Sequence, residues 1–209
     1  MTDDAHNVPT GLELSRGQLL GMTLGVEGGM LVVGAALAYF LGVRFWEGMS
    51  VSASSLGWGV LSAIPMLLGA IGIFYSNSKM GVQLRNDFDL VILMFRKARV
   101  VDLVFVSIMA GLCEEVLFRG FGQNVIVGYI GVWPGLVVAS LIFGVFHFVS
   151  FSYFVFATLI GVYLGGVYVW TGDLVIPIVG HAVYDFIALA YGVREGRRRD
   201  SEGQSSPIN

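Results

Sequence analysis

The chain has 209 residues, of which 56% are hydrophobic and only 13% are charged. Soluble domains contain about a quarter charged residues, so this composition indicates a membrane protein. The net charge of −3 predicts no nucleic-acid partner, and the single cysteine, Cys113, excludes an intrachain disulfide framework.

An α-helix needs about 20 apolar residues to cross the hydrocarbon core of a bilayer. Apolar stretches of this order lie at about 18–43, 54–75, 100–128, 132–150, 152–171 and 174–193. The sequence therefore predicts an all-α fold, a polytopic membrane helix bundle with about six transmembrane helices. The apolar piece 88–95 is too short to span, and we expect it to be an interfacial segment.

Basic residues predict the orientation, because cytoplasmic loops of membrane proteins are enriched in Lys and Arg. With six spans, ten of the twelve basic residues fall on the side that holds both termini. We therefore expect an integral, multi-pass membrane protein with both termini in the cytoplasm. Its predicted parts are a cytoplasmic N-terminal segment (1–17), two helices with a basic cytoplasmic loop (18–99), a core (100–193) and a polar, disordered tail (194–209).

Small residues recur every four positions on two of the apolar stretches. They are Gly21, Gly25 and Gly29 on the first stretch, and Gly161 and Gly165 on the fifth. Such stripes let helices approach each other closely in a membrane, so we expect both of them to be packing surfaces.

Glu114, Glu115 and Arg119 interrupt the third apolar stretch, where inserting a charged side chain costs roughly 2.5–3.5 kcal/mol. At about 100° per helical residue, Arg119 lies about 40° around the helix from Glu115 but about 140° from Glu114. We therefore expect Glu115 and Arg119 to neutralise each other. Glu114 is left without a cation, and a carboxylate in apolar surroundings holds a proton tightly, which suits a general base. The alternative is that all three residues form only a packing network.

Two later apolar stretches each carry a histidine. Phe143 and His147 lie one turn apart, so the aromatic ring can keep the imidazole dry and fix its orientation. His181 and Asp185 are also one turn apart, and a carboxylate can fix the tautomer of an imidazole. Taken alone, His147 is explained more simply as a core histidine that is bonded to a backbone carbonyl.

Together these residues suffice for a site that activates water. Glu114 and His147 could polarise a water molecule, while His181 and Asp185 could bind the oxyanion that forms at an attacked carbonyl. A divalent metal such as zinc is the alternative, held by Glu114, His147 and His181, because two histidines and a carboxylate are zinc-type ligands.

The three motifs, in this order, resemble those of the CPBP family, which comprises CAAX prenyl endopeptidases and bacteriocin-processing, or Abi-type, intramembrane proteases. The family pattern is EExxxR, then FxxxH, then HxxxN or HxxxD, and every motif position is matched here. The resemblance implies an all-helical membrane peptidase of glutamate or metal-dependent type. It implies that Glu114 and His147 activate the water and that His181 and Asp185 hold the oxyanion. Prenyl-processing members carry Asn at the position of Asp185, which leaves metal binding more open in this chain.

Two functions of other classes remain as alternatives. A non-catalytic membrane partner or immunity-type protein could use the same scaffold without cleaving a substrate. A proton-coupled transporter also uses buried acids and histidines, and Glu27 in the first apolar stretch fits that function. The intact motifs favour a peptidase that acts on a peptide or protein substrate at the lipid bilayer.

Overall fold

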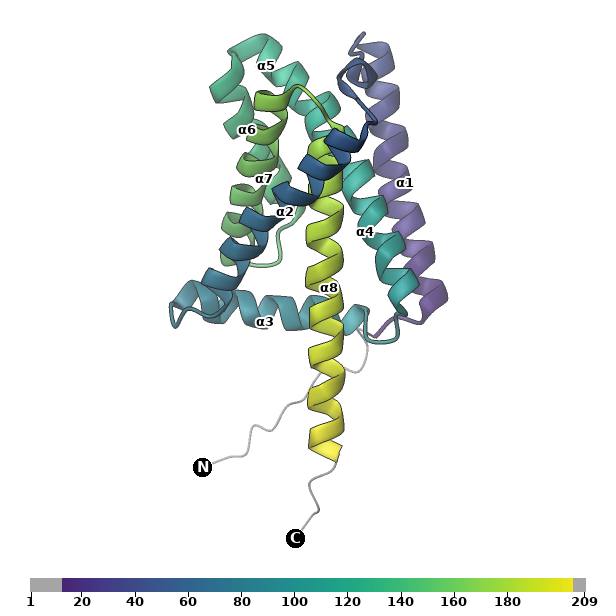
Figure 1. Ribbon diagram of the computed structural model, residues 1–209, viewed down its shortest axis with the longest axis vertical. Coiled ribbons are helices and arrows are strands. Elements are labelled where there is room, and N and C mark those ends of the chain that lie inside the picture. The colour runs from purple at the N-terminus through teal and green to yellow at the C-terminus, as the bar shows by residue number, and fades with distance from the viewer. Residues whose placement is uncertain (1–12, 205–209) are drawn as a thin grey trace.

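Helices make up every regular element of residues 13–204, the part of the chain that the computed structural model describes (Figure 1). The elements are α1 (Arg16–Phe40), η1 (Phe45–Gly48), α2 (Ala53–Phe74), α3 (Lys79–Met94), α4 (Val100–Glu115), η2 (Val116–Gln123), α5 (Asn124–Ile130), α6 (Val132–Phe146), α7 (Phe151–Thr171) and α8 (Val175–Gln204). The predicted all-α bundle is confirmed.

Within the described residues, four helices are long and apolar enough to cross a membrane by length and composition: α1, α2, α7 and α8. The apolar helix α6 is shorter, with 15 residues. The predicted stretch 100–128 is a continuous helical run in which α4 passes into η2 and then α5. The chain is thus an integral membrane protein, and α6 and the α4–α5 run account for the other two predicted stretches.

Helix α3 lies across one end of the bundle instead of running along it, and the start of α1 lies at the same end (Figure 1). This placement agrees with an interfacial segment, although the helix begins earlier than the predicted piece 88–95. Arg85 of α3 donates to the carbonyl oxygens of Phe74 and Ser76, which ties α3 to the end of α2.

The structure differs from the predicted disordered tail, because α8 extends through residues 194–204. Ion pairs one turn apart stabilise this polar end of the helix. Arg198 contacts Glu195 at 2.6 Å and Glu202 at 2.7 Å. The rest of the predicted tail, 205–209, lies outside the described residues.

The two glycine stripes have different surroundings. A Cβ added to Gly161 would lie 3.2 Å from a side chain of α6, so this stripe is a packing surface as expected. A Cβ added to Gly21, Gly25 or Gly29 would meet no other described atom within 4 Å. The packing prediction is therefore wrong for α1 within this chain, because α1 turns a different face toward the bundle.

Helices α2 and α8 approach each other closely at Gly59. A Cβ added to Gly59 would lie 2.8 Å from Cγ1 of Val179 and 3.1 Å from the carbonyl oxygen of Ile176. The missing side chain therefore sets the distance between the two backbones. This contact positions the segment of α8 that carries His181 and Asp185.

Candidate active site

The acidic pair lies where α4 ends and a π-helix begins. Glu114 and Glu115 are the last two residues of α4, and η2 continues the chain as π-helix. Isolated π-helical turns are rare and occur frequently at functional sites. One turn before the acids, a Cβ on Gly111 would lie 2.7 Å from the carbonyl oxygen of Ile178. The close approach of α4 to α8 brings the acidic pair against the next motif.

Glu115 is fully buried, and its Oε1 atom contacts a guanidinium and an imidazole. Nη1 of Arg119 donates to it at 2.8 Å, and Nδ1 of His181 donates to it at 2.9 Å. The expected ion pair with Arg119 is present, but the contact with His181 was not predicted. Glu115 therefore links the third apolar stretch directly to α8.

The charge of Arg119, which is only 2% exposed, is satisfied on three sides. Besides its bond to Glu115, its Nη2 atom donates to the carbonyl oxygen of Gly161 at 3.2 Å. Its Cζ atom lies 4.3 Å from the centroid of the Phe143 ring, within the range of a cation–π interaction. Arg119 thus connects η2 to α6 and α7.

Glu114 contacts His147, at the C-terminal end of α6. Its Oε2 atom lies 3.3 Å from Nε2 of His147, yet this oxygen has no hydrogen-bond partner among the described residues. The two groups are therefore in contact without an aligned hydrogen bond. Nδ1 of His147 donates to the carbonyl oxygen of Phe143 at 2.9 Å, which orients Nε2 toward Glu114. Glu114 and His147 are thus in contact, as the sequence predicts.

The ring of Phe143 lies close to both histidines. Its centroid lies 4.3 Å from that of His147 and 6.2 Å from that of His181. The ring is almost completely buried, so it keeps water away from the inner faces of both imidazoles. Its supporting role stays a prediction.

His181 lies between two carboxylates. Its Nδ1 atom contacts Glu115, and its Nε2 atom lies 3.5 Å from Oδ2 of Asp185, at the limit of a hydrogen bond. His181 is buried, whereas the side chain of Asp185 is 27% exposed. Asp185 therefore forms the outer edge of the site.

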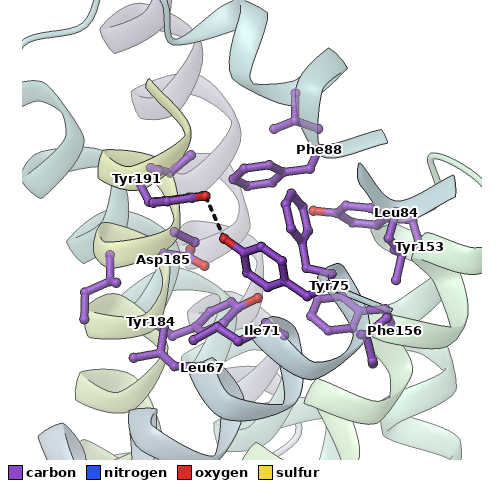
Figure 2. Close-up of a pocket in the computed structure, with 17 residues that line it drawn as sticks. Leu67, Ile71, Tyr75, Leu84, Phe88, Tyr153, Phe156, Tyr184, Asp185 and Tyr191 are labelled. Atoms are coloured by element: carbon purple, nitrogen blue, oxygen red, sulfur yellow. Dashed lines mark hydrogen bonds between the residues drawn. The ribbon is translucent and has the colours of Figure 1, made fainter. Parts of the chain in front are cut away.

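A largely apolar cavity of about 340 Å³ reaches Asp185 from the side of α3 (Figure 2). Its walls come from α2, α3, α7 and α8, and Asp185 is the one charged residue among the described residues that line it. The hydroxyl groups of Tyr75 and Tyr191 are hydrogen-bonded across it at 3.1 Å (Figure 2). An apolar cavity with a single polar edge suits an apolar part of a substrate.

One further acid, which the three motifs do not include, interacts with this site. Glu27 of α1 interacts electrostatically with Glu114, His147, His181 and Asp185. The sequence signal for Glu27 is an acidic residue within an apolar stretch, which fits the transporter alternative. The spacing of residues within α1 could not show that this helix packs against α4.

The candidate metal ligands do not fit a metal ion in this arrangement. Residues 13–204 contain no group of three His, Cys, Asp or Glu side chains that could hold one. Both ring nitrogens of His181 already face carboxylates, those of Glu115 and Asp185. Nδ1 is held by its hydrogen bond to Glu115, so only Nε2, which faces Asp185 at 3.5 Å, is left to join Glu114 and His147.

Fold and site together define a helical membrane protein that gathers buried carboxylates and histidines from α4, α6 and α8. Residues 96–187 match the family model of the type II CAAX prenyl endopeptidase Rce1-like proteins. The resemblance that the three motifs predict is therefore confirmed for this segment.

A curated relative from Bacillus subtilis (strain 168), described as the uncharacterized protein YpbD, is 33% identical over 114 residues. The match covers 53% of this chain and 56% of the relative, so the chain spans about half the length of that protein. No solved structure matches the chain at a significant level.

Proposed function

We propose that this protein is an intramembrane endopeptidase that hydrolyses a peptide bond of a membrane-associated substrate. The contact between Glu114 and His147 carries the proposal, because it joins a carboxylate and an imidazole from two motifs far apart in sequence. The family match over residues 96–187 supports a membrane protease.

Glu114 and His147 activate the water in this mechanism. Oε2 of Glu114 makes no hydrogen bond to any described residue, so it is available to take a proton from a bound water. The side chain of His147 is 27% exposed, which lets water and substrate reach its Nε2 atom. The resulting hydroxide attacks the carbonyl carbon of the scissile bond.

His181 stabilises the oxyanion that this attack creates. Glu115 accepts the hydrogen bond from Nδ1 and so fixes the ring, and the two flanking carboxylates stabilise a doubly protonated imidazole. The 3.5 Å separation from Asp185 is too long for a tight hydrogen bond, so Nε2–H is free to donate to the oxyanion. Asp185 faces Nε2 and helps to orient the ring.

The cavity next to Asp185 gives the substrate class a physical basis. Its walls consist mainly of aromatic and aliphatic side chains from four helices (Figure 2). An apolar segment of the substrate would lie there, which would place the adjacent peptide bond beside Asp185 and His181. A polar, soluble peptide would gain little from this surface.

A cleavage assay in lipid vesicles tests the proposal. Candidate substrates are prenylated C-terminal peptides, leader peptides and membrane segments, and products are identified by mass spectrometry. We expect Glu114→Gln to lower kcat by about 10²–10⁴-fold, since it removes the general base. His147→Ala and His181→Ala should also lose activity, whereas Glu47→Gln removes an exposed carboxylate and should not.

Three results would contradict the proposal. Wild-type rates in Glu114→Gln would exclude Glu114 as the base. Loss of activity on chelation, restored by zinc, would replace the metal-free mechanism by a metal-dependent one. Absence of cleavage of every candidate class by the wild type would favour a non-catalytic partner on this scaffold.

A further inference from the structure

The face that α1 turns toward the bundle carries an acidic residue. The buried residues of this helix are Leu19, Thr23, Gly34 and Ala38. At about 100° per residue, these four positions and Glu27 fall within an arc of about 100°. Glu27 therefore lies on the face that packs against the rest of the chain, away from the exposed glycine stripe.

Two contacts fix how α1 is aligned with its neighbour α4. Near the start of both helices, Nε of Arg16 lies 2.6 Å from Oδ2 of Asp102. Farther along, a Cβ added to Gly34 would lie 3.2 Å from Cα of Leu117, just after α4 ends. The two helices therefore run side by side in the same direction, as Figure 1 also shows.

This alignment places Glu27 beside the acidic pair. Both helices rise about 1.5 Å per residue, so a position between the two contacts can be interpolated. Glu27 falls level with residues 110–113, the turn that leads into Glu114. In agreement, Glu27 interacts electrostatically with both Cys113 and Glu114.

One oxygen of the Glu27 carboxyl group lacks a hydrogen-bond partner among the described residues. Its Oε2 atom is buried and bonds to no described residue. The titratable groups with which it interacts are the carboxyls of Glu114 and Asp185, the imidazoles of His147 and His181, and the thiol of Cys113. The exposed part of α1 faces acyl chains rather than water, because this helix is apolar enough to span the membrane. An ionised carboxylate whose buried oxygen accepts no hydrogen bond is costly there, and binding a proton removes that cost.

We propose that Glu27 is the proton donor of this site. As a neutral acid it gives its proton to the amide nitrogen of the leaving group while the C–N bond breaks. Glu114 holds the proton taken from water and returns it to Glu27 afterwards, so each cycle consumes one water and yields one carboxyl and one amine. The inference rests on the proposed peptidase function and adds a catalytic residue from outside the family-matching segment 96–187.

Kinetics in lipid vesicles over a range of pH test this role. Glu27→Gln keeps the shape and polarity of the side chain but cannot donate a proton, so kcat should fall about 10²-fold with KM unchanged. The loss of wild-type activity at alkaline pH, where the acid is ionised, should disappear in this variant. Glu27→Asp should recover part of the rate. The matched control is Thr23→Val, one turn earlier on the same face, and it should keep the wild-type kcat.

Infrared spectroscopy of the full-length protein gives a readout that does not need a substrate. A protonated carboxyl band should be present in the wild type at neutral pH, absent in Glu27→Gln and retained in Glu114→Gln. A wild type without this band, or a cleaving Glu27→Gln with wild-type kcat and pH profile, overturns the role of Glu27 and leaves the peptidase proposal intact. If the wild type cleaves nothing, the peptidase proposal and the donor role fail together, and the band then reports only a neutral acid.

Discussion

Replacing Arg119 by Met should destabilise the protein much more than the same replacement at Arg44. Arg119 is buried and its partner Glu115 is 0% exposed, so the substitution leaves a carboxylate inside the bundle without its main cation. The Arg44–Glu47 pair is similarly short, at 2.8 Å, but its side chains are 67% and 56% exposed. The separation and the residue types are the same, so the pairs differ in burial and in the further contacts of Arg119 with Phe143 and Gly161.

The expected magnitudes follow from burial. Breaking a buried ion pair by removing one partner costs about 3–5 kcal/mol in the free energy of unfolding. Loss of the cation–π contact between Arg119 and Phe143 adds about 1 kcal/mol. An exposed pair contributes only about 0–1 kcal/mol, so Arg44→Met should be close to the wild type.

Unfolding in mixed micelles, titrated with a denaturing detergent and followed by circular dichroism, measures these free energies. The double variant Glu115→Gln with Arg119→Met should be roughly 1–3 kcal/mol more stable than Arg119→Met alone, since it removes the unpaired charge. The glutamine oxygen can still accept from His181. The reasoning is refuted if Arg119→Met is as stable as Arg44→Met, or if the double variant loses the sum of the two single effects.

Two further predictions concern α8 and its contact with α2. Asp185→Asn should retain cleavage, because the amide side chain can donate a hydrogen bond to the oxyanion. Asp185→Ala should lose about 10²-fold in kcat, because its side chain cannot donate. Equal rates for the two variants would remove Asp185 from the mechanism. Gly59→Ala should lower stability by about 1–3 kcal/mol, since its Cβ would lie 2.5 Å from Cβ of Val179. Gly57→Ala, which meets no described neighbour within 4 Å, should not. A thermal melt of the purified protein separates the two glycine variants.

The spacing of residues along the chain is sufficient to predict contacts within one helix. Glu115 and Arg119 were predicted to pair from an α-helical spacing, and they do pair although the helix becomes a π-helix at Val116. The wider π-helical turn still brings positions four and five apart onto one face, so the pairing tolerates the change. The π-helix itself has no such local signature in the apolar sequence.

The helical end of α8 could have been predicted from the same local rule. Glu195, Arg198 and Glu202 are spaced three and four residues apart, which favours ion pairs along one helix face. The polar composition of the tail suggests disorder. The regular spacing of its opposite charges, which composition does not describe, indicates a helix instead. The error shows that a polar tail with regular opposite charges is a candidate helix.

Contacts between different helices could not be predicted from the spacing of residues within one helix. The contact of Glu115 with His181 depends on how closely α4 approaches α8, which Gly111 permits. The place of Glu27 depends on the alignment of α1 with α4, which is set by contacts at both ends of the pair. Both facts require the packing of helices far apart in sequence, and neither follows from the order of residues along one of them.

The shared oxygen of Glu115 changes what its ion pair with Arg119 means. The sequence alone indicates only that Glu115 and Arg119 offset the cost of two charges in an apolar helix. In the structure the same Oε1 atom also accepts from His181, the proposed oxyanion donor. Arg119 therefore influences how strongly Glu115 holds the imidazole. Substitutions at Arg119 should alter kcat as well as stability, and a variant that retains full stability but loses rate would show that the pair serves the chemistry.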